Sequence, residues 1–184
     1  MSETPSVVSV YTEFKRRLGN LGPVVVAGGA VRDDLMGRAP KDFDVFVLGV
    51  PFTDESAQAV RDTCVDVPSI EALDFHKSEP FLAVSLNWNG VMVQVMCSPL
   101  TSTAALLDSF DWNVSRFAFD GECHALEDIG NIATGKPLRL HRVTYHQSTL
   151  RRGFRFSERF GMVFTRADVV DLCRGIVNAE ESVL

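Results

Sequence analysis

Apolar and polar residues recur along this chain with two periods, one typical of helices and one typical of strands. Between residues 5 and 18, apolar side chains recur at helical spacing, and Thr4-Pro5 is a suitable helix start. Around Asn89-Gly90, two apolar runs flank a dipeptide that favours tight hairpin turns. The pattern predicts helices over residues 5–18, 30–36, 54–65, 104–107, 149–160 (with Ser148 as its cap) and 166–177, and strands over residues 24–26, 41–47, 81–88 and 91–97.

Two adjacent glycines separate the first predicted strand from the short helix that follows it. Gly28 and Gly29 lack a Cβ atom, so the backbone can turn sharply there and its N–H groups can approach a ligand closely. An anion above this turn would lie near a helix N-terminus, where unpaired N–H groups favour negative charge. The pattern favours phosphate binding, although Gly-Gly alone is typical of an ordinary turn.

The next predicted strand carries two aspartates. Side chains alternate between the faces of a strand, so Asp42 and Asp44 point to one face while Phe43 and Val45 point to the other. Two neighbouring carboxylates repel each other, and a divalent cation relieves that repulsion. Mg²⁺ is typically held by one or two carboxylates together with substrate phosphates. Asp-x-Asp alone is typical of a solvated strand edge, but together with the glycine turn it indicates a nucleotide site.

The ordered combination of these features resembles the signature of a known superfamily. The order is a strand, Gly-Gly-Ala-Val-Arg-Asp, a short helix and Lys-Asp-x-Asp on a second strand. It is similar to the nucleotidyltransferase superfamily, in the branch that contains the head domains of class II tRNA CCA-adding enzymes and bacterial poly(A) polymerases. The resemblance implies an α+β, polymerase beta-like nucleotidyltransferase fold. In that fold a mixed sheet has flanking helices and is followed by a short C-terminal helical segment.

Two later stretches extend the resemblance to about residues 21 to 162. The segment from Phe110 to Gly121 is similar to a second family motif, in which Asp111 matches a nucleotide-binding aspartate. The segment from Ser148 to Gly161 is similar to an arginine-bearing helix, in which Arg152 and Arg155 match nucleotide-contacting arginines. Without the resemblance, the first segment predicts a hairpin turn at its Asp-Gly end, and the second predicts a solvated helix face.

The resemblance also implies roles for the residues of the site. The predicted catalytic and metal-binding residues are Asp42 and Asp44, with two Mg²⁺ ions expected. The predicted nucleotide-binding residues are Gly28, Gly29, Arg32, Asp111, Arg152 and Arg155. The expected activity is transfer of a nucleoside monophosphate from an NTP (ATP and/or CTP) to an acceptor hydroxyl, with release of pyrophosphate.

The chain departs from the family pattern at Gln94, where a strand in the superfamily often supplies a third carboxylate. An amide can orient a ligand through hydrogen bonds, but it brings no charge to a metal. Three interpretations remain open: two aspartates suffice, Asp111 assists, or the activity is weak. Phe110, Ser115 and Thr149 also replace residues that are usual in the family.

Composition and charge limit the choice of partners. The net charge of −6 argues against a general nucleic-acid coat, but nine of the 18 Lys and Arg residues lie between Lys136 and Arg174. No apolar run approaches the ~20 residues of a membrane span, no signal peptide is recognisable, and the four cysteines are isolated, so a cytoplasmic location is expected.

We expect a head domain over residues 1–145 and a short helical appendage over residues 146–184. The favoured acceptor is an RNA 3′ end, with tRNA favoured on resemblance alone. Transfer to a protein or a small molecule remains an alternative, as does a non-catalytic head that only binds nucleotide.

Overall fold

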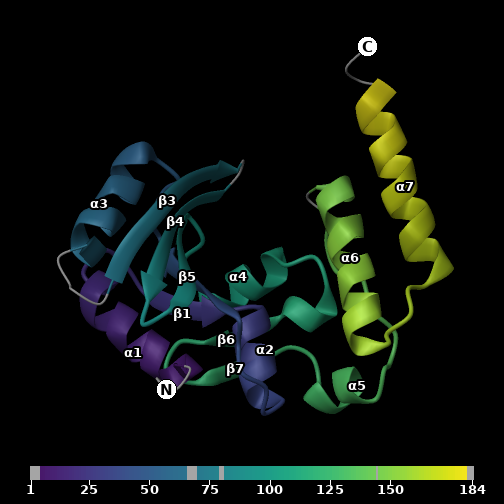
Figure 1. Ribbon diagram of the computed structural model, residues 1–184. Helices are drawn as coiled ribbons and strands as arrows, with labels where there is room; N and C mark the ends of the chain where they lie inside the picture. Colours follow the sequence, from purple (N-terminus) through teal and green to yellow (C-terminus); the bar gives the residue numbers. More distant parts are fainter. Residues whose placement is uncertain (1–4, 66–69, 79–80, 144, 182–184) are drawn as a thin grey trace.

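The computed structural model describes residues 5–65, 70–78, 81–143 and 145–181. Its helices are α1 (Val7–Leu18), α2 (Gly29–Leu35), α3 (Asp54–Val65), α4 (Thr103–Ser109), α5 (Ile129–Ala133), α6 (His146–Phe160) and α7 (Arg166–Glu181), with a 3₁₀ turn η1 (Asn113–Ser115). Its strands are β1 (Val24–Ala27), β2 (Asp42–Leu48), β3 (Ile70–Ser78), β4 (Phe81–Trp88), β5 (Val91–Ser98), β6 (Phe117–Phe119) and β7 (Cys123–Ala125). Figure 1 shows these elements in sequence colours.

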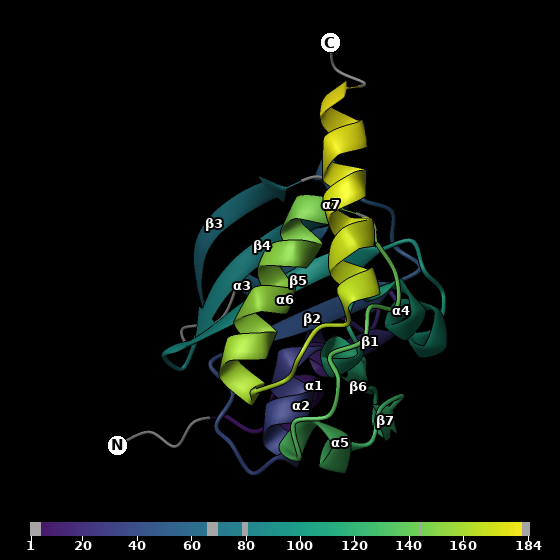
Figure 2. The same ribbon diagram turned by 90° about the vertical axis from the view of Figure 1, so that its right-hand side faces the viewer.

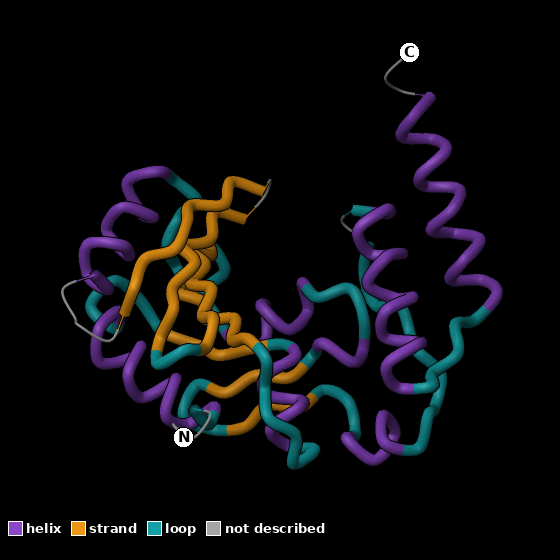
Figure 3. Tube along the Cα trace, viewed as in Figure 1, coloured by secondary structure: helices purple, strands orange, loops and turns teal. Residues whose placement is uncertain are grey.

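The strands form a single mixed sheet in the order β3-β4-β5-β2-β1-β6-β7. The β2–β5 pair is parallel, and the other pairs are antiparallel. Helices lie on both sides of the strands (Figure 3). The predicted α+β architecture, a mixed sheet with flanking helices, is confirmed.

Strand β2 lies between two apolar cores because its side chains alternate between the faces of the sheet. Phe43, Val45 and Val47 belong to the larger core, to which α1 and α3 contribute. Phe46 and Leu48 belong to a smaller core that includes the α4 residues Leu106 and Leu107. Asp42 and Asp44 share the face of Phe46. They therefore lie on the same side of the sheet as α4, but nearer the start of β2 than the residues that α4 covers.

Most predicted elements form within a residue or two of their expected bounds. The predicted Asn89-Gly90 turn is confirmed, and both residues have positive φ, as a tight hairpin requires. Ser6 caps α1 by accepting a hydrogen bond from the Ser9 amide, while Thr4 lies outside the described residues. The expectation that Ser148 caps α6 is wrong, because that helix starts at His146 and its N-cap residue is Tyr145.

Strand β3 is an element that the sequence pattern does not predict. Its pairing with β4 shifts register between Ala72 and Asp74, and such a bulge breaks the alternation on which strand prediction depends.

Helix α6 packs on the rest of the fold through the buried Trp112. The Trp112 indole N–H donates to the Thr149 carbonyl oxygen over 2.9 Å. A Cβ atom on Gly153 would lie 2.6 Å from the Trp112 ring and 2.5 Å from Phe164. Because no side chain fits there, glycine lets α6 approach this indole closely.

Helix α7 runs beside α6 and projects beyond the rest of the molecule at its C-terminal end (Figures 1 and 2). The expected division after residue 145 falls just before α6 and stays a prediction. None of the helices in the described part of the chain has both the length and the apolar character that crossing a membrane requires.

Candidate functional site

The register of the sheet places Asp44 at the centre of a row of residues. On one side it stands opposite Ala27 of β1, and on the other side opposite Gln94 of β5. Asp42 stands two residues earlier, opposite Met92. Asp42 is exposed, whereas Asp44 is partly buried. Gln94 is therefore the residue of β5 that stands directly beside Asp44.

The surroundings of Asp44 disfavour the charged form of its carboxylate. Burial, and secondarily the negative charge of Asp42, raises the pKa of Asp44 to about 7. A bound divalent cation would offset both effects, so this pair of carboxylates fits Mg²⁺ chemically. Among the described residues no cluster of three or more His, Cys, Asp or Glu side chains could hold a metal ion. A magnesium ion here would need further ligands from water or from substrate phosphates.

The glycine turn lies directly beside Asp44. Gly28 has a φ of +82°, and a Cβ atom on it would lie 3.5 Å from the Asp44 carboxylate oxygen Oδ2. The Gly28 amide donates to the Phe117 carbonyl oxygen over 2.8 Å. The Gly28 amide is therefore already bonded within the protein. Gly29 is the first residue of α2, and binding of nucleotide at either glycine stays a prediction.

Arg32 is buried, with 1% of its surface exposed. Its Nε and Nη2 atoms donate to Asp33 Oδ1 over 3.0 and 2.8 Å, and Nη1 donates to the Val114 carbonyl oxygen over 3.0 Å. The guanidinium also lies 4.6 Å from the centre of the Phe160 ring. Burial lowers the pKa of Arg32 from its ordinary value, against the opposing effect of Asp33. Contact between Arg32 and nucleotide stays a prediction, and this burial disfavours it.

Asp111 and Arg152, predicted separately, contact each other. Arg152 donates from Nε to Asp111 Oδ2 over 2.8 Å, and Nη2 makes a second hydrogen bond to the same oxygen. Asp111 Oδ1 accepts the Trp112 amide. The pair fixes α6 against the segment that precedes η1, and Arg152 is thus partly neutralised by a carboxylate of the protein itself.

Arg155 lies on the exposed surface of α6. We find no hydrogen bond or ion pair from its guanidinium to any residue that the structure describes. It therefore retains an uncompensated positive charge, which suits an anionic ligand.

Sequence reasoning missed a second ion pair that holds α6. Arg159 donates from Nη2 to Asp33 Oδ2 over 2.7 Å. The two residues are 126 positions apart in the chain, so no local pattern connects them.

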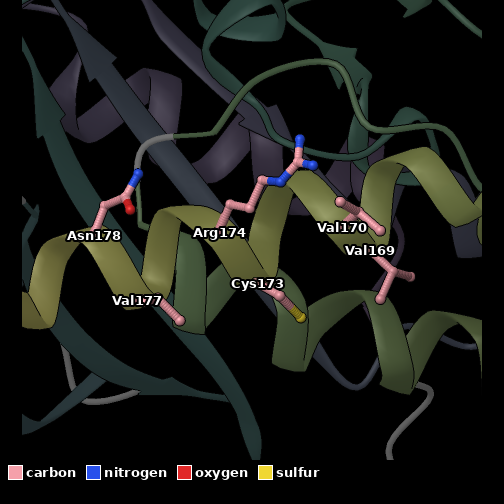
Figure 4. A pocket seen from close by; sticks show the side chains of 6 residues that line it. All are labelled: Val169, Val170, Cys173, Arg174, Val177 and Asn178. Carbon is pink, nitrogen blue, oxygen red and sulfur yellow. The ribbon is translucent and has the colours of Figure 1, made fainter.

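The structure also has a shallow pocket on the exposed side of α7 (Figure 4). It is lined by Val169, Val170, Cys173, Arg174, Val177 and Asn178. None of the predicted site residues lines it.

Comparisons with known proteins agree with this geometry at the level of the fold. A family model described as Gabija anti-defense 2 family protein (Gad2) matches residues 6–152. A search of curated proteins finds no match. Among solved structures, a tRNA-processing enzyme in apo form is 18% identical, with a TM-score of 0.63 over 97% of this chain and 49% of its own.

Two further structures carry ligands. A CCA-adding enzyme in complex with CTP is 20% identical, with a TM-score of 0.63 over 94% of this chain and 42% of its own. The Thermotoga maritima CCA-adding enzyme in complex with tRNA is 19% identical, with a TM-score of 0.62 and the same coverage. The chain thus spans less than half the length of these structures, and at this identity the likeness establishes the fold alone.

Proposed function

The chain belongs to the Gabija anti-defense 2 family, and we propose that it is a metal-dependent nucleotidyltransferase. It would transfer a nucleoside monophosphate from an NTP to an acceptor hydroxyl and release pyrophosphate. The family description names a role against Gabija defence, and this transfer would be the chemistry through which the chain takes part in it. The family model covers 147 of the 184 residues, including both strand aspartates.

One observation carries the proposal. Asp42 and Asp44 share one face of β2, and the Asp44 carboxylate borders the positive-φ turn at Gly28. A carboxylate whose pKa is raised to about 7 costs free energy in the ligand-free protein. Such a cost is typical of groups arranged for a ligand rather than for packing.

Each group of the site would have its own task. Asp42 and Asp44 would hold Mg²⁺, which when bound would activate the acceptor hydroxyl and neutralise the charge of the leaving pyrophosphate. Arg155 would hold the triphosphate through charge-assisted hydrogen bonds, and the turn at Gly28 and Gly29 would leave room for it beside β2. Arg152, already bonded to Asp111, would keep α6 in place and offer its remaining N–H groups.

We favour an RNA 3′ end as acceptor and ATP or CTP as donor. This choice is supported by similar structures whose descriptions include CTP, ATP and tRNA. A protein or a small molecule as acceptor remains the alternative. The identity of the labelled product would separate these acceptors.

The test is release of pyrophosphate with each NTP in Mg²⁺, with and without bulk tRNA. Asp42→Asn and Asp44→Asn should each abolish release, because either change removes a carboxylate from the metal site. Asp34→Asn is the matched control, since Asp34 is an exposed aspartate on the neighbouring helix α2. Release that survives both Asn substitutions would refute the metal-site assignment, and dependence on tRNA would identify RNA as the acceptor.

A second candidate function is a head that binds nucleotide without turnover. It is favoured by Gln94, the amide that pairs in register with Asp44 where the superfamily often has a carboxylate. Mg²⁺-dependent binding of NTP without pyrophosphate release would favour this candidate. Turnover that requires both aspartates would exclude it.

A further inference from the structure

Asp33 joins two helices that lie far apart in the sequence. It is 3% exposed. One carboxylate oxygen accepts hydrogen bonds from Arg32 on its own helix α2, and the other accepts from Arg159 on α6. The Phe160 ring lies against both cations, with its centre 4.6 Å from the Arg32 guanidinium and 5.3 Å from that of Arg159. The carboxylate is therefore shared between the helix that follows the glycine turn and the helix that carries Arg155.

The arginines of α6 explain why this contact matters for the site. Arg152, Arg155 and Arg159 follow one another at spacings of three and four residues, so they lie along one stripe of the helix. The two outer arginines are bonded to carboxylates of the body, Arg152 to Asp111 and Arg159 to Asp33. These two contacts, two helical turns apart, fix both the position and the rotation of α6.

The middle arginine differs from its neighbours. Arg155 is exposed and has no ion pair with any residue in the described part of the chain. Because it shares their stripe, fixing the two outer arginines also fixes the direction in which Arg155 leaves the helix. Because the helix that carries Arg155 is already fixed, less reorientation is needed when this arginine binds an anion.

We propose that Asp33 is a positioning residue for the anion site: by holding Arg159 it sets α6 so that Arg155 faces a polyphosphate bound beside the glycine turn of α2. Asp33 itself does not touch the ligand. This inference rests on the proposed function, because it assumes that the polyphosphate is that of the NTP.

The rival explanation is that Asp33 only stabilises the fold. A buried carboxylate between two arginines costs free energy when one partner is removed, whatever the protein does. A purely structural role predicts that loss of stability and loss of ligand binding go together. A positioning role predicts that the contribution of Arg155 to binding disappears when Asp33 is replaced, even in protein that remains folded.

The experiment uses inorganic tripolyphosphate as a probe, titrated calorimetrically into the full chain, so that binding is measured without turnover. In Asp33→Asn we expect tripolyphosphate affinity to fall about 10- to 100-fold, because Arg155 would lose its charged hydrogen bond to the ligand. Asp34→Asn is the matched control, one residue further along α2 and exposed, and it should change affinity by less than about twofold.

Because Asp33→Asn also disturbs buried Arg32, a second variant tests the same contact from its exposed side. Arg159→Gln breaks the bond between the helices and leaves the hydrogen bonds of Arg32 in place, and the Arg159 side chain is 40% exposed. It should weaken binding in the same range, whereas Arg151→Gln on the same helix should not. Hydrogen exchange of the folded variants should show faster exchange in α6 for Arg159→Gln than for wild type, and no such change for Arg151→Gln.

The decisive measurement is a double-mutant cycle. Arg155→Gln should weaken tripolyphosphate binding about 10- to 100-fold in the wild-type background and by less than about threefold in the Arg159→Gln background. Equal effects of Arg155→Gln in both backgrounds would overturn the positioning role, as would failure of the wild-type chain to bind tripolyphosphate. Failure of the proposed function has a different signature: tripolyphosphate binds and the cycle is non-additive, but no NTP releases pyrophosphate.

Discussion

Replacing Asp44 by asparagine should make the ligand-free protein more stable at alkaline pH. In the folded protein, burial and the charge of Asp42 raise the pKa of Asp44 from its ordinary value of 3.8 to about 7. The folded state therefore binds this proton more tightly than the unfolded state does. The free energy of unfolding consequently falls as the pH rises from about 4 to about 7, and the full cost persists above that range.

The size of this cost follows from the two pKa values. They are about three pH units apart, and each unit corresponds to about 1.4 kcal/mol, which gives a ceiling of about 4 kcal/mol at pH 8. Asp44 is only partly buried, and rearrangement of solvent lowers the ceiling, so we expect about 1–3 kcal/mol. Asparagine is nearly isosteric with aspartate and carries no charge, so Asp44→Asn should recover this free energy at pH 8 and little of it near pH 4.

Urea unfolding followed by tryptophan fluorescence is a suitable assay, since both tryptophans, Trp88 and Trp112, are buried. It should be run at pH 5 and pH 8 in EDTA, with Asp34→Asn as the exposed control. Mg²⁺ added at pH 8 should stabilise the wild-type chain and leave Asp44→Asn largely unchanged. The reasoning is refuted if Asp44→Asn is less stable than wild type at pH 8, or if their difference does not depend on pH.

Three further substitutions have defined outcomes. Gly153→Ala should destabilise the fold by about 1–3 kcal/mol in urea unfolding, because its methyl group would overlap the Trp112 ring; unchanged stability would contradict the tight packing of α6. Gln94→Glu would set a carboxylate opposite Asp44 and should raise the Mg²⁺ affinity seen in calorimetry, at a cost in stability without metal. Gly28→Ala should cost about 1–3 kcal/mol in the same unfolding assay, because alanine is strained at a φ of +82°. An alanine variant as stable as wild type would rule out a backbone requirement for glycine there.

Local patterns in the sequence were sufficient for most of the secondary structure and for part of the site. Alternation along β2 predicted that Asp42 and Asp44 share a face, because that relationship depends only on strand geometry. The Asn89-Gly90 turn was equally local, since both residues tolerate positive φ at little cost. The order of strand, glycine turn, helix and Asp-x-Asp strand was enough to indicate the fold.

Other features were decided only by tertiary structure. Whether Arg32 faces solvent or Asp33 depends on the packing of α6, whose sequence lies more than a hundred residues away. The Gly28 amide could have been free, but pairing of β1 with β6 brings the Phe117 carbonyl oxygen to it. An amino-acid sequence records which groups can donate, accept or carry charge. Contacts between distant segments decide which of those groups are bonded inside the protein. They also decide which groups, such as Arg155, remain available to a ligand.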